Sequence, residues 1–155
     1  MALTTLGNTA FGTSSVVSAA IKDNAVVFNK LDANTAHTDR NQSFSVAQRG
    51  TISDLGVKAA GTLTLDMNTA NHFKVVVNGN ITIANPSNVT AGQGGSIVLT
   101  ANGNYTTSFG SQWRFAEGSA PTLSTSSGKQ DRLDYYVASS NTIHTIATID
   151  LLGTA

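Results

Sequence analysis

Apolar residues recur at every second position through most of the chain after residue 42, and this period restricts the fold more than any other feature. Successive side chains of a β-strand point to opposite faces, so a period of two predicts strands that bury one face. The stretches TLTLDM, HFKVVV, ITI and SIVLT follow it, and we expect their inward residues to be Leu63, Leu65, Met67, Phe73, Val75, Val77, Ile81, Ile83, Ile97 and Leu99.

The two most regular stretches are DRLDYYVAS and TIHTIATIDL, near the C-terminal end. In the second, His144 falls on the face opposite to Ile143, Thr145, Ala147, Ile149 and Leu151. A strand with one apolar and one polar face is typical of a sheet with one solvated side. We therefore expect these two stretches to be strands of the main sheet.

Short turn signals separate the strands. Asn78-Gly79 and Asn102-Gly103 are each followed by a further strand-like stretch, and Asn-Gly favours a tight hairpin because both central residues of a type I′ turn need positive φ. Charged residues make up only 12% of the chain, with Glu117 as its single glutamate, whereas long surface helices use more of them. Residues 42–155 are thus predicted to form an all-β domain, an antiparallel β-sandwich of the jelly-roll kind or a small barrel.

Residues 1–41 have a different composition and are predicted to be an extended N-terminal arm. Small residues dominate this segment, and its large apolar side chains occur singly or in pairs, so it cannot bury a core of its own. A short helix and a short strand both remain open for part of it. We expect the arm to pack against other subunits or a capsid through Val16, Val17, Ile21, Val26, Val27, Phe28 and Leu31.

The glycine-rich loop Gly92-Gln93-Gly94-Gly95 has two interpretations. A phosphate-binding loop requires a following Lys and Ser/Thr at fixed offsets and a helix whose N-terminus faces the phosphate. Here the glycines lead directly into the strand-like stretch SIVLT. The structural interpretation, a tight turn or bulge that needs positive φ, is therefore preferred.

Charge and cysteine content exclude several classes of function. The formal net charge is zero and the cations are scattered, so nucleic-acid and anionic-membrane partners are not expected. The chain has no cysteine, which removes disulfides, thiolate catalysis and cysteine-bound zinc. Neither a secretory leader nor an apolar stretch long enough to span a bilayer is recognisable. No cofactor is expected.

Catalytic and metal-binding patterns are weak. His37, His72 and His144 lack the short spacing of metal ligands. A glycosidase needs two carboxylates facing a cleft, and only Glu117 with Asp131 or Asp134 offers a local set. No G-x-S-x-G motif for a serine nucleophile occurs. We therefore expect that the protein is not an enzyme.

The same carboxylates have a structural alternative, in which Arg114, Glu117, Asp131, Arg132 and Asp134 form ion pairs around a rim or a subunit boundary.

Trp113 also has two interpretations, a sugar-stacking platform or a ring packed at the end of the sandwich with its indole N–H bonded nearby. The first would place a glycan contact at Trp113, Arg114 and Glu117.

Three stretches together resemble a domain of small virion proteins of tailed bacteriophages, of the tail-fibre and minor structural kind. They are HFKVVVNGNITIANPSNVTAGQGGSIVLTANG, SQWRFAEGSAPTLSTSSGKQDRLDYYV and IHTIATIDL, within residues 42–151. The segment SAAIKDNAVVFNKL is similar to short units of phage fibres in which three chains pack together, although only one such unit is present. The resemblance implies a homotrimer with a β-sandwich head, made in the host cytoplasm and located in the virion.

Two functions follow as expectations. The first is a capsid decoration, or cement, protein that binds the major capsid protein at the capsid surface and stabilises the head shell by non-covalent packing. The second is a short tail-fibre or receptor-binding module, in which Trp113 and the loop 116–129 contact a host surface glycan. The zero net charge and the weak catalytic patterns favour the first.

Overall fold

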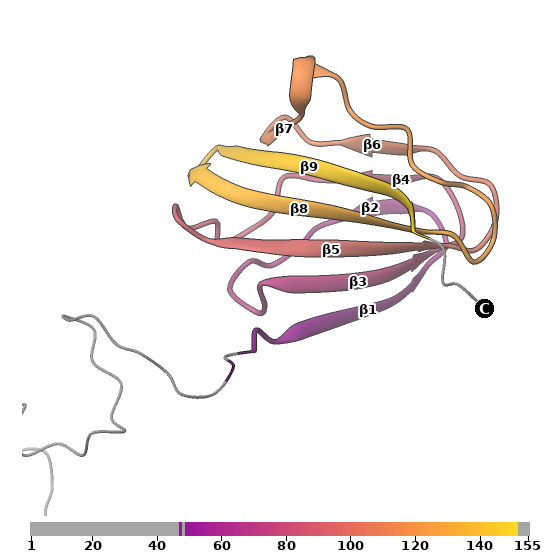
Figure 1. Cartoon of the computed structure of the whole chain (residues 1–155), viewed down its shortest axis with the longest axis horizontal. Coiled ribbons are helices and arrows are strands. Elements are labelled where there is room, and N and C mark those ends of the chain that lie inside the picture. The colour runs from indigo at the N-terminus through magenta and orange to yellow at the C-terminus, as the bar shows by residue number, and fades with distance from the viewer. Residues whose placement is uncertain (1–46, 48, 152–155) are drawn as a thin grey trace, which may run out of the picture. The chain divides into compact units, whose positions relative to one another are not determined.

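The computed structural model describes residue 47 and residues 49–151. The predicted arm, with all seven of its proposed contact residues, lies outside this range. Nine strands and one 3₁₀ turn make up the described part (Figure 1): β1 Ile52–Lys58, β2 Gly61–Leu63, β3 His72–Val77, β4 Ile81–Ile83, β5 Gly94–Ala101, β6 Thr107–Phe109, β7 Trp113–Arg114, η3 Ala116–Gly118, β8 Gln130–Ser139 and β9 Thr142–Leu151.

The first six strands form three successive coils, each of which contributes one strand to each of two sheets. Strands β1, β3 and β5 pair in parallel in the larger sheet, and β2, β4 and β6 pair in parallel in the smaller one. Each coil thus crosses from one sheet to the other and returns to the first, as in a parallel β-solenoid. Figure 1 shows β2 and β4 behind the long strands of the larger sheet.

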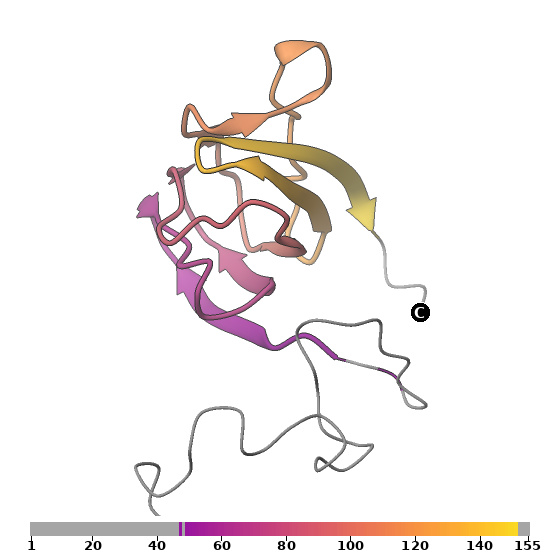
Figure 2. The same cartoon turned by 90° about the vertical axis from the view of Figure 1, so that its left-hand side faces the viewer.

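A hairpin of β8 and β9 continues the larger sheet beyond the third coil. Strand β8 pairs antiparallel with β5 and with β9, and the short β7 pairs parallel with β9. The strand orders are β1-β3-β5-β8-β9-β7 and β2-β4-β6. The 3₁₀ turn η3 follows β7 and projects from this edge (Figures 1 and 2).

The prediction of an all-β fold is confirmed, but antiparallel pairing is wrong for the pairs that β1 to β6 form with one another, which are all parallel. The jelly-roll arrangement is not confirmed, since neighbouring strands of a jelly roll pair antiparallel, whereas β1, β3 and β5 pair in parallel, as do β2, β4 and β6. Parallel sheets are usually covered on both faces and then read as continuous apolar runs. Here the parallel strands bury one face only, so they carry the alternation that is typical of antiparallel sheets.

The two Asn-Gly pairs lie at corners between the sheets, so the predicted hairpins at these positions are wrong. Asn78-Gly79 connects β3 to β4, and Asn102-Gly103 lies between β5 and β6. At Gly79 an added Cβ would lie 1.5 Å from the carbonyl oxygen of Ala59 in the preceding coil. Glycine is needed there because two coils approach closely.

Polar side chains join one coil to the next along the stack. The Asn80 side-chain oxygen accepts the Thr106 N–H at 2.9 Å, and Thr82 and Ser108 share a hydroxyl hydrogen bond of 2.8 Å. The Gln93 amide donates to the Asn71 side-chain oxygen at 3.1 Å. These partners are 22 or 26 residues apart in the chain, so the bonds fix the register of whole coils.

A single core lies between the two sheets and contains every residue predicted to face inward in the four stretches from TLTLDM to SIVLT. Ile143, Thr145 and Leu133 are also buried, as the alternation indicates. The prediction is wrong for Ile149 and Leu151, which are 40% and 37% exposed. The β8–β9 register shifts between Gln130 and Arg132, and this irregularity ends the alternation.

Strand β1 was not predicted from the sequence. Its large apolar residues Ile52, Leu55 and Val57 do not alternate, and its register with β3 shifts between Asp54 and Val57. Within this bulge Gly56 has φ +66° and donates its N–H to the Asp54 carboxylate at 3.0 Å. A bulge on an edge strand hinders further strand pairing.

The glycine-rich loop is a turn that leads into β5, as the structural interpretation expected. Gly92 has φ +89° and donates its N–H to the Val137 carbonyl. Gly94 and Gly95 begin β5, and an added Cβ at Gly95 would lie 1.7 Å from the Asn71 carbonyl oxygen. The loop thus holds two coils close together and shows no helix N-terminus.

We predict that Gly95→Ala lowers the free energy of unfolding by about 3 kcal/mol, because the added methyl group must displace the Asn71 backbone. Gly94→Ala is the matched control, since its Cβ would make only an ordinary contact of 3.5 Å with the Tyr135 carbonyl. That neighbouring change should leave stability unchanged or raise it by up to about 1 kcal/mol. Urea denaturation of the two full-length variants compares them directly, and equal stabilities would contradict the close-approach argument.

Candidate functional site

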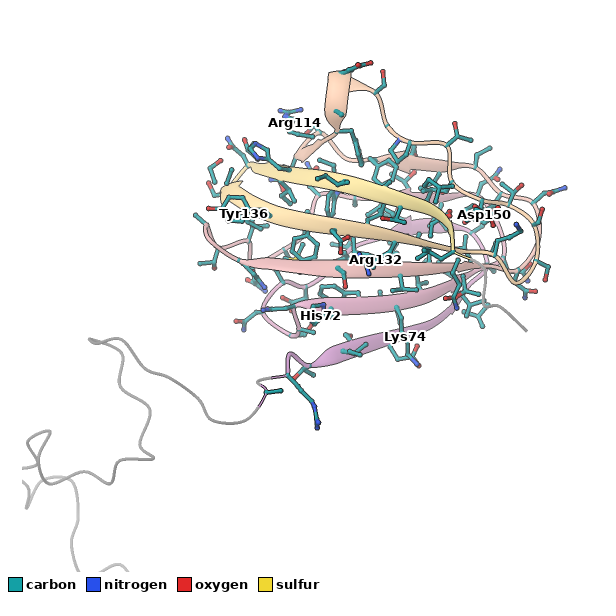
Figure 3. All side chains as sticks on the ribbon, in the orientation of Figure 1. His72, Lys74, Arg114, Arg132, Tyr136 and Asp150 are labelled. Carbon is teal, nitrogen blue, oxygen red and sulfur yellow. The ribbon has the colours of Figure 1, made fainter. Side chains whose placement is uncertain are left out.

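The outer face of the larger sheet carries charged and polar side chains in rows across the strands (Figure 3). Lys74 pairs with Asp54 at 2.9 Å, and Arg132 pairs with Asp134 on the same strand at 2.9 Å. The hydrogen bond from the Gly56 N–H has the largest effect on the Asp54 carboxyl group and lowers its pKa. The hydrogen bond from Lys74 lowers the same pKa further. Since both pairs are largely solvated, they contribute little to stability, but they keep this part of the face close to neutral.

Large apolar side chains are also exposed, and most of them lie on the hairpin. Tyr136 on β8 is 53% exposed and Ile146 on β9 is 74% exposed. Together with Ile149 and Leu151 they form what we call the hairpin patch. Ile52 and Val57 on β1, at the other edge of the sheet, are exposed as well.

Trp113, the predicted sugar platform, is buried with only 4% of its surface exposed. Its indole N–H donates to the Ala84 carbonyl at 2.9 Å, and its ring meets Tyr135 edge to face. A ring enclosed in this way cannot stack on a sugar. The predicted glycan contact at Trp113 is therefore wrong, and the residue belongs to the core. This is the alternative interpretation that the sequence left open.

Arg114 and Glu117, the other two residues of that predicted contact, are both exposed. Arg114 lies on β7, and Glu117 lies in η3 with φ +57°. Within residues 49–151, neither side chain takes part in an ion pair. Of the five residues expected to form rim ion pairs, the structure brings together Arg132 and Asp134.

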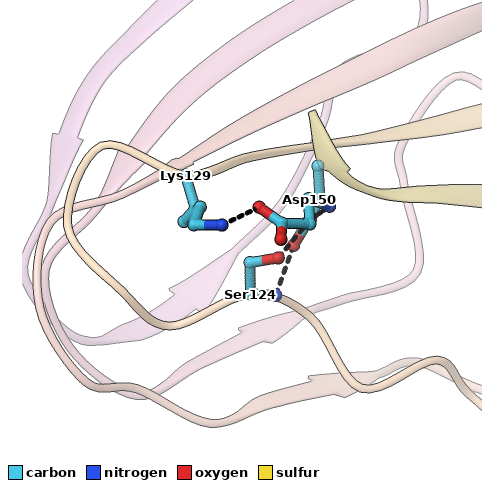
Figure 4. Close-up of polar contacts among 4 residues, drawn as sticks. Ser124, Lys129 and Asp150 are labelled. Atoms are coloured by element: carbon cyan, nitrogen blue, oxygen red, sulfur yellow. Dashed lines mark hydrogen bonds and ion pairs between the residues drawn. The ribbon is translucent and has the colours of Figure 1, made fainter. Parts of the chain in front are cut away.

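Asp131 has a role that the sequence interpretation missed. It is only 1% exposed, and its carboxylate accepts three hydrogen bonds: from the Ser124 N–H at 2.6 Å, the Ser124 hydroxyl at 2.8 Å and the Asp150 N–H at 2.8 Å. Asp150 also pairs with Lys129 (Figure 4). One buried carboxylate thus ties the loop after η3 to the end of β9.

The signal for this role was present in the alternation. Asp131 is in phase with the buried residues Leu133, Tyr135 and Val137, so an inward carboxylate could have been expected. A buried carboxylate needs several hydrogen-bond donors. The serine-rich loop that precedes β8 can supply them through its hydroxyl groups and its backbone N–H groups.

Two buried tyrosines have hydroxyl groups whose pKa is well above the ordinary value. Burial raises the pKa of Tyr135 to about 12, and its hydroxyl donates to the Asn71 carbonyl at 2.8 Å. Burial, with a smaller effect of the Asp131 charge, also raises the pKa of Tyr105 to about 12. Both hydroxyls therefore stay protonated at neutral pH.

The two described histidines lie on the outer face, as expected. His72 Nδ1 is 3.0 Å from the Ser96 hydroxyl, and His144 is exposed on β9; His37 lies outside the described residues. Between residues 49 and 151, no group of three His, Asp or Glu side chains could hold a metal ion. The described residues also contain no helix with the length and apolar character to cross a membrane.

Comparisons with models of protein families, with curated proteins and with solved structures gave no significant match to this chain.

We predict that Asp131→Asn destabilises the protein by about 2–3 kcal/mol, because an amide nitrogen would face an N–H or O–H donor that the carboxylate now satisfies. Asp134→Asn is the matched control on the same strand, and loss of its exposed ion pair should cost less than about 1 kcal/mol. Chemical denaturation at neutral pH measures both variants. Equal losses would show that Asp131 does not anchor the loop.

Stability should also fall at alkaline pH. The pKa values of Tyr105 and Tyr135 rise from 10.0 to about 12 on folding, so between these values the folded state binds more protons than the unfolded state. Their contribution is complete below pH 10 and is lost as the pH rises toward 12. Lysines titrate in the same range, so the comparison is between wild type and Tyr135→Phe, whose unfolding free energy should depend less steeply on pH. If the unfolding free energies of the two proteins depended equally on pH, the proposed contribution of Tyr135 would be contradicted.

Proposed function

We propose that the protein is a structural component of a bacteriophage virion, a homotrimer that decorates the capsid surface and stabilises the head shell by packing against the major capsid protein. The starting point is the resemblance of residues 42–151 to phage virion proteins. The observation that carries the proposal is the exposed hairpin patch, which gives a rigid β unit an apolar surface for another subunit.

The size of the exposed side chains supports this use of the hairpin patch. Burying a side chain such as Ile146 stabilises an assembly by about 1.5–3 kcal/mol. Tyr136 and Ile146 are neighbours on the outer face of the hairpin, because Tyr136 pairs with His144 and Ile146 with Asp134. Neighbouring exposed apolar residues on a folded domain commonly mark an interaction surface. A second copy of the chain is the proposed occupant, because zero net charge leaves little repulsion between copies. The threefold arrangement is taken from the resemblance.

The coils suit a load-bearing role. Backbone ladders run along both sheets, and side-chain hydrogen bonds join successive coils. A shear that separates two coils must break these bonds together. The chain has no cysteine, so a disulfide cannot attach it to the shell, and we assign the arm and the hairpin patch to non-covalent packing.

The proposal includes no catalysis, and the positions of Glu117, Asp131 and Asp134 agree with this. Asp131 is buried and saturated by donors, Asp134 pairs with Arg132, and Glu117 is exposed on η3. None of these is the paired acid and base that a glycosidase needs. Nucleic acid and membranes are not proposed as partners, since the chain has no excess of cations.

The second candidate is a short tail-fibre or receptor-binding module that contacts a host surface glycan. It ranks below decoration because Trp113 is buried, which leaves Arg114 and Glu117 of the predicted contact. Copy number separates the two candidates, since a decoration protein occupies the whole shell whereas a fibre is present in few copies.

We predict that the full-length chain sediments as a trimer and that Ile146→Lys weakens association by more than about tenfold, because a lysine would replace a buried apolar contact. Thr62→Lys is the matched control, an equally charged change at an exposed position of β2 in the other sheet. Sedimentation velocity over a concentration series measures both. A wild-type monomer, or equal effects of the two changes, would contradict the proposed interface. Quantitative mass spectrometry of purified particles then gives the copy number.

A further inference from the structure

An open hollow of about 380 Å³ lies on the outer face of the larger sheet, over strands β1, β3 and β5. Its main lining residues are Gly50, Ile52, His72, Lys74, Ser96 and Val98. The Gly50 backbone forms one wall and lies so close to the His72 ring that an added Cβ would be 2.8 Å from it. Since about 150 Å³ is enough to enclose a benzene-sized apolar group, the hollow has room for a large aliphatic side chain.

The polar groups of this hollow already have partners within the chain. His72 Nδ1 lies 3.0 Å from the Ser96 hydroxyl, and the Lys74 ammonium group pairs with a carboxylate of β1 at 2.9 Å. The surface that remains for another molecule is mainly apolar. It is supplied by Ile52, which is 61% exposed, and by Val98. An apolar side chain placed here would be removed from water, which is favourable.

Ile146 of the hairpin patch is the most exposed large apolar residue in the part of the chain that the structure describes. It lies in the same cross-strand row as the hollow. The strand registers place five paired residues in this row: Ile52, His72, Ser96, Asp134 and Ile146. The four strand steps from β1 to β9 separate the ends of the row by about 19 Å. Ile146 therefore cannot reach the hollow of its own chain, but it can reach that of a second copy.

Threefold symmetry requires two different contact surfaces on each subunit. In a closed ring of three, each interface is heterologous, so one surface of a subunit meets a different surface of its neighbour. The hairpin patch supplies a projecting surface at the β9 end of the sheet. The hollow supplies a concave surface at the β1 end, and the residues that contribute most to an interface commonly fill such pockets.

We propose that Ile146 of one subunit inserts into the hollow of the next subunit, between Ile52 and Val98, and that three such contacts close the ring. This inference rests on the proposed homotrimer, and it names the surface that receives the hairpin patch. Because both contact surfaces lie on the outer face of the larger sheet, the ring turns these faces inward and leaves the smaller sheets on its outside.

Cysteine cross-linking of the full-length chain tests this contact, and the introduced thiols are the only ones because the chain has no cysteine. A disulfide requires the two Cα atoms to approach within about 7 Å. Ile146→Cys combined with Ile52→Cys or with Val98→Cys should give a covalent trimer on non-reducing electrophoresis after mild oxidation. Ile146→Cys combined with Thr62→Cys is the matched control, since Thr62 is exposed in the other sheet. The control and Ile146→Cys alone should both remain single chains.

Sedimentation of the wild type distinguishes failure of the trimer from failure of this contact. A wild-type monomer would contradict the homotrimer itself. A wild-type trimer in which neither cysteine pair forms a cross-link would overturn the contact and leave the homotrimer standing. The reduced variants should still sediment as trimers, because cysteine is itself a small apolar residue.

The size of the cross-linked products tests the arrangement of the subunits. A disulfide-linked dimer of Ile146→Cys alone would show that hairpin patches meet each other, and the proposal would then be rejected. Covalent products longer than three chains would exclude the closed ring. A product that stops at three chains, formed only when the hollow also carries a cysteine, is the expected result.

Discussion

The close stacking of successive coils is the constraint on which the rest of this structure depends. Neighbouring strands in a sheet lie about 4.8 Å apart, and where a corner or a strand start passes directly over the previous coil, no side chain fits between them. Gly79 and Gly95 occupy two such places, opposite the carbonyl oxygens of Ala59 and Asn71. Larger residues there would separate the coils and interrupt the hydrogen-bond ladders of both sheets.

The ends of the stack determine which surfaces remain available for contacts. Strand β8 covers the edge of β5 and extends the sheet into the hairpin, whereas the bulge at Gly56 interrupts the regular edge of β1. Further strand addition at β1 is thus hindered. Contacts with other molecules are then expected through sheet faces and loops, which is why the exposed side chains of β9 matter for the proposed assembly.

Asp131 connects this scaffold to the loop that follows η3. It lies on the inward face of β8, so its position is set by the sheet, and its three hydrogen bonds transmit that position to Ser124 and Asp150. A loop rich in Ser, Thr and Gly has little apolar surface of its own to hold it in place. The buried carboxylate supplies the missing constraint.

The sequence by itself determined most of the strands and their inward faces, with β1 and the end of β9 as the exceptions, because side-chain alternation is a local property of a strand. The stretches HFKVVV, ITI and TIHTIATIDL match β3, β4 and β9 residue for residue. Only the tertiary structure decided how the strands pair. Ile52 and His72 pair 20 residues apart, but His72 and Ser96 pair 24 apart, so unequal coils conceal the repeat. Likewise, the enclosure of Trp113 and the hydrogen bonds of the buried Asp131 depend on residues brought together from distant parts of the chain, which local patterns do not encode.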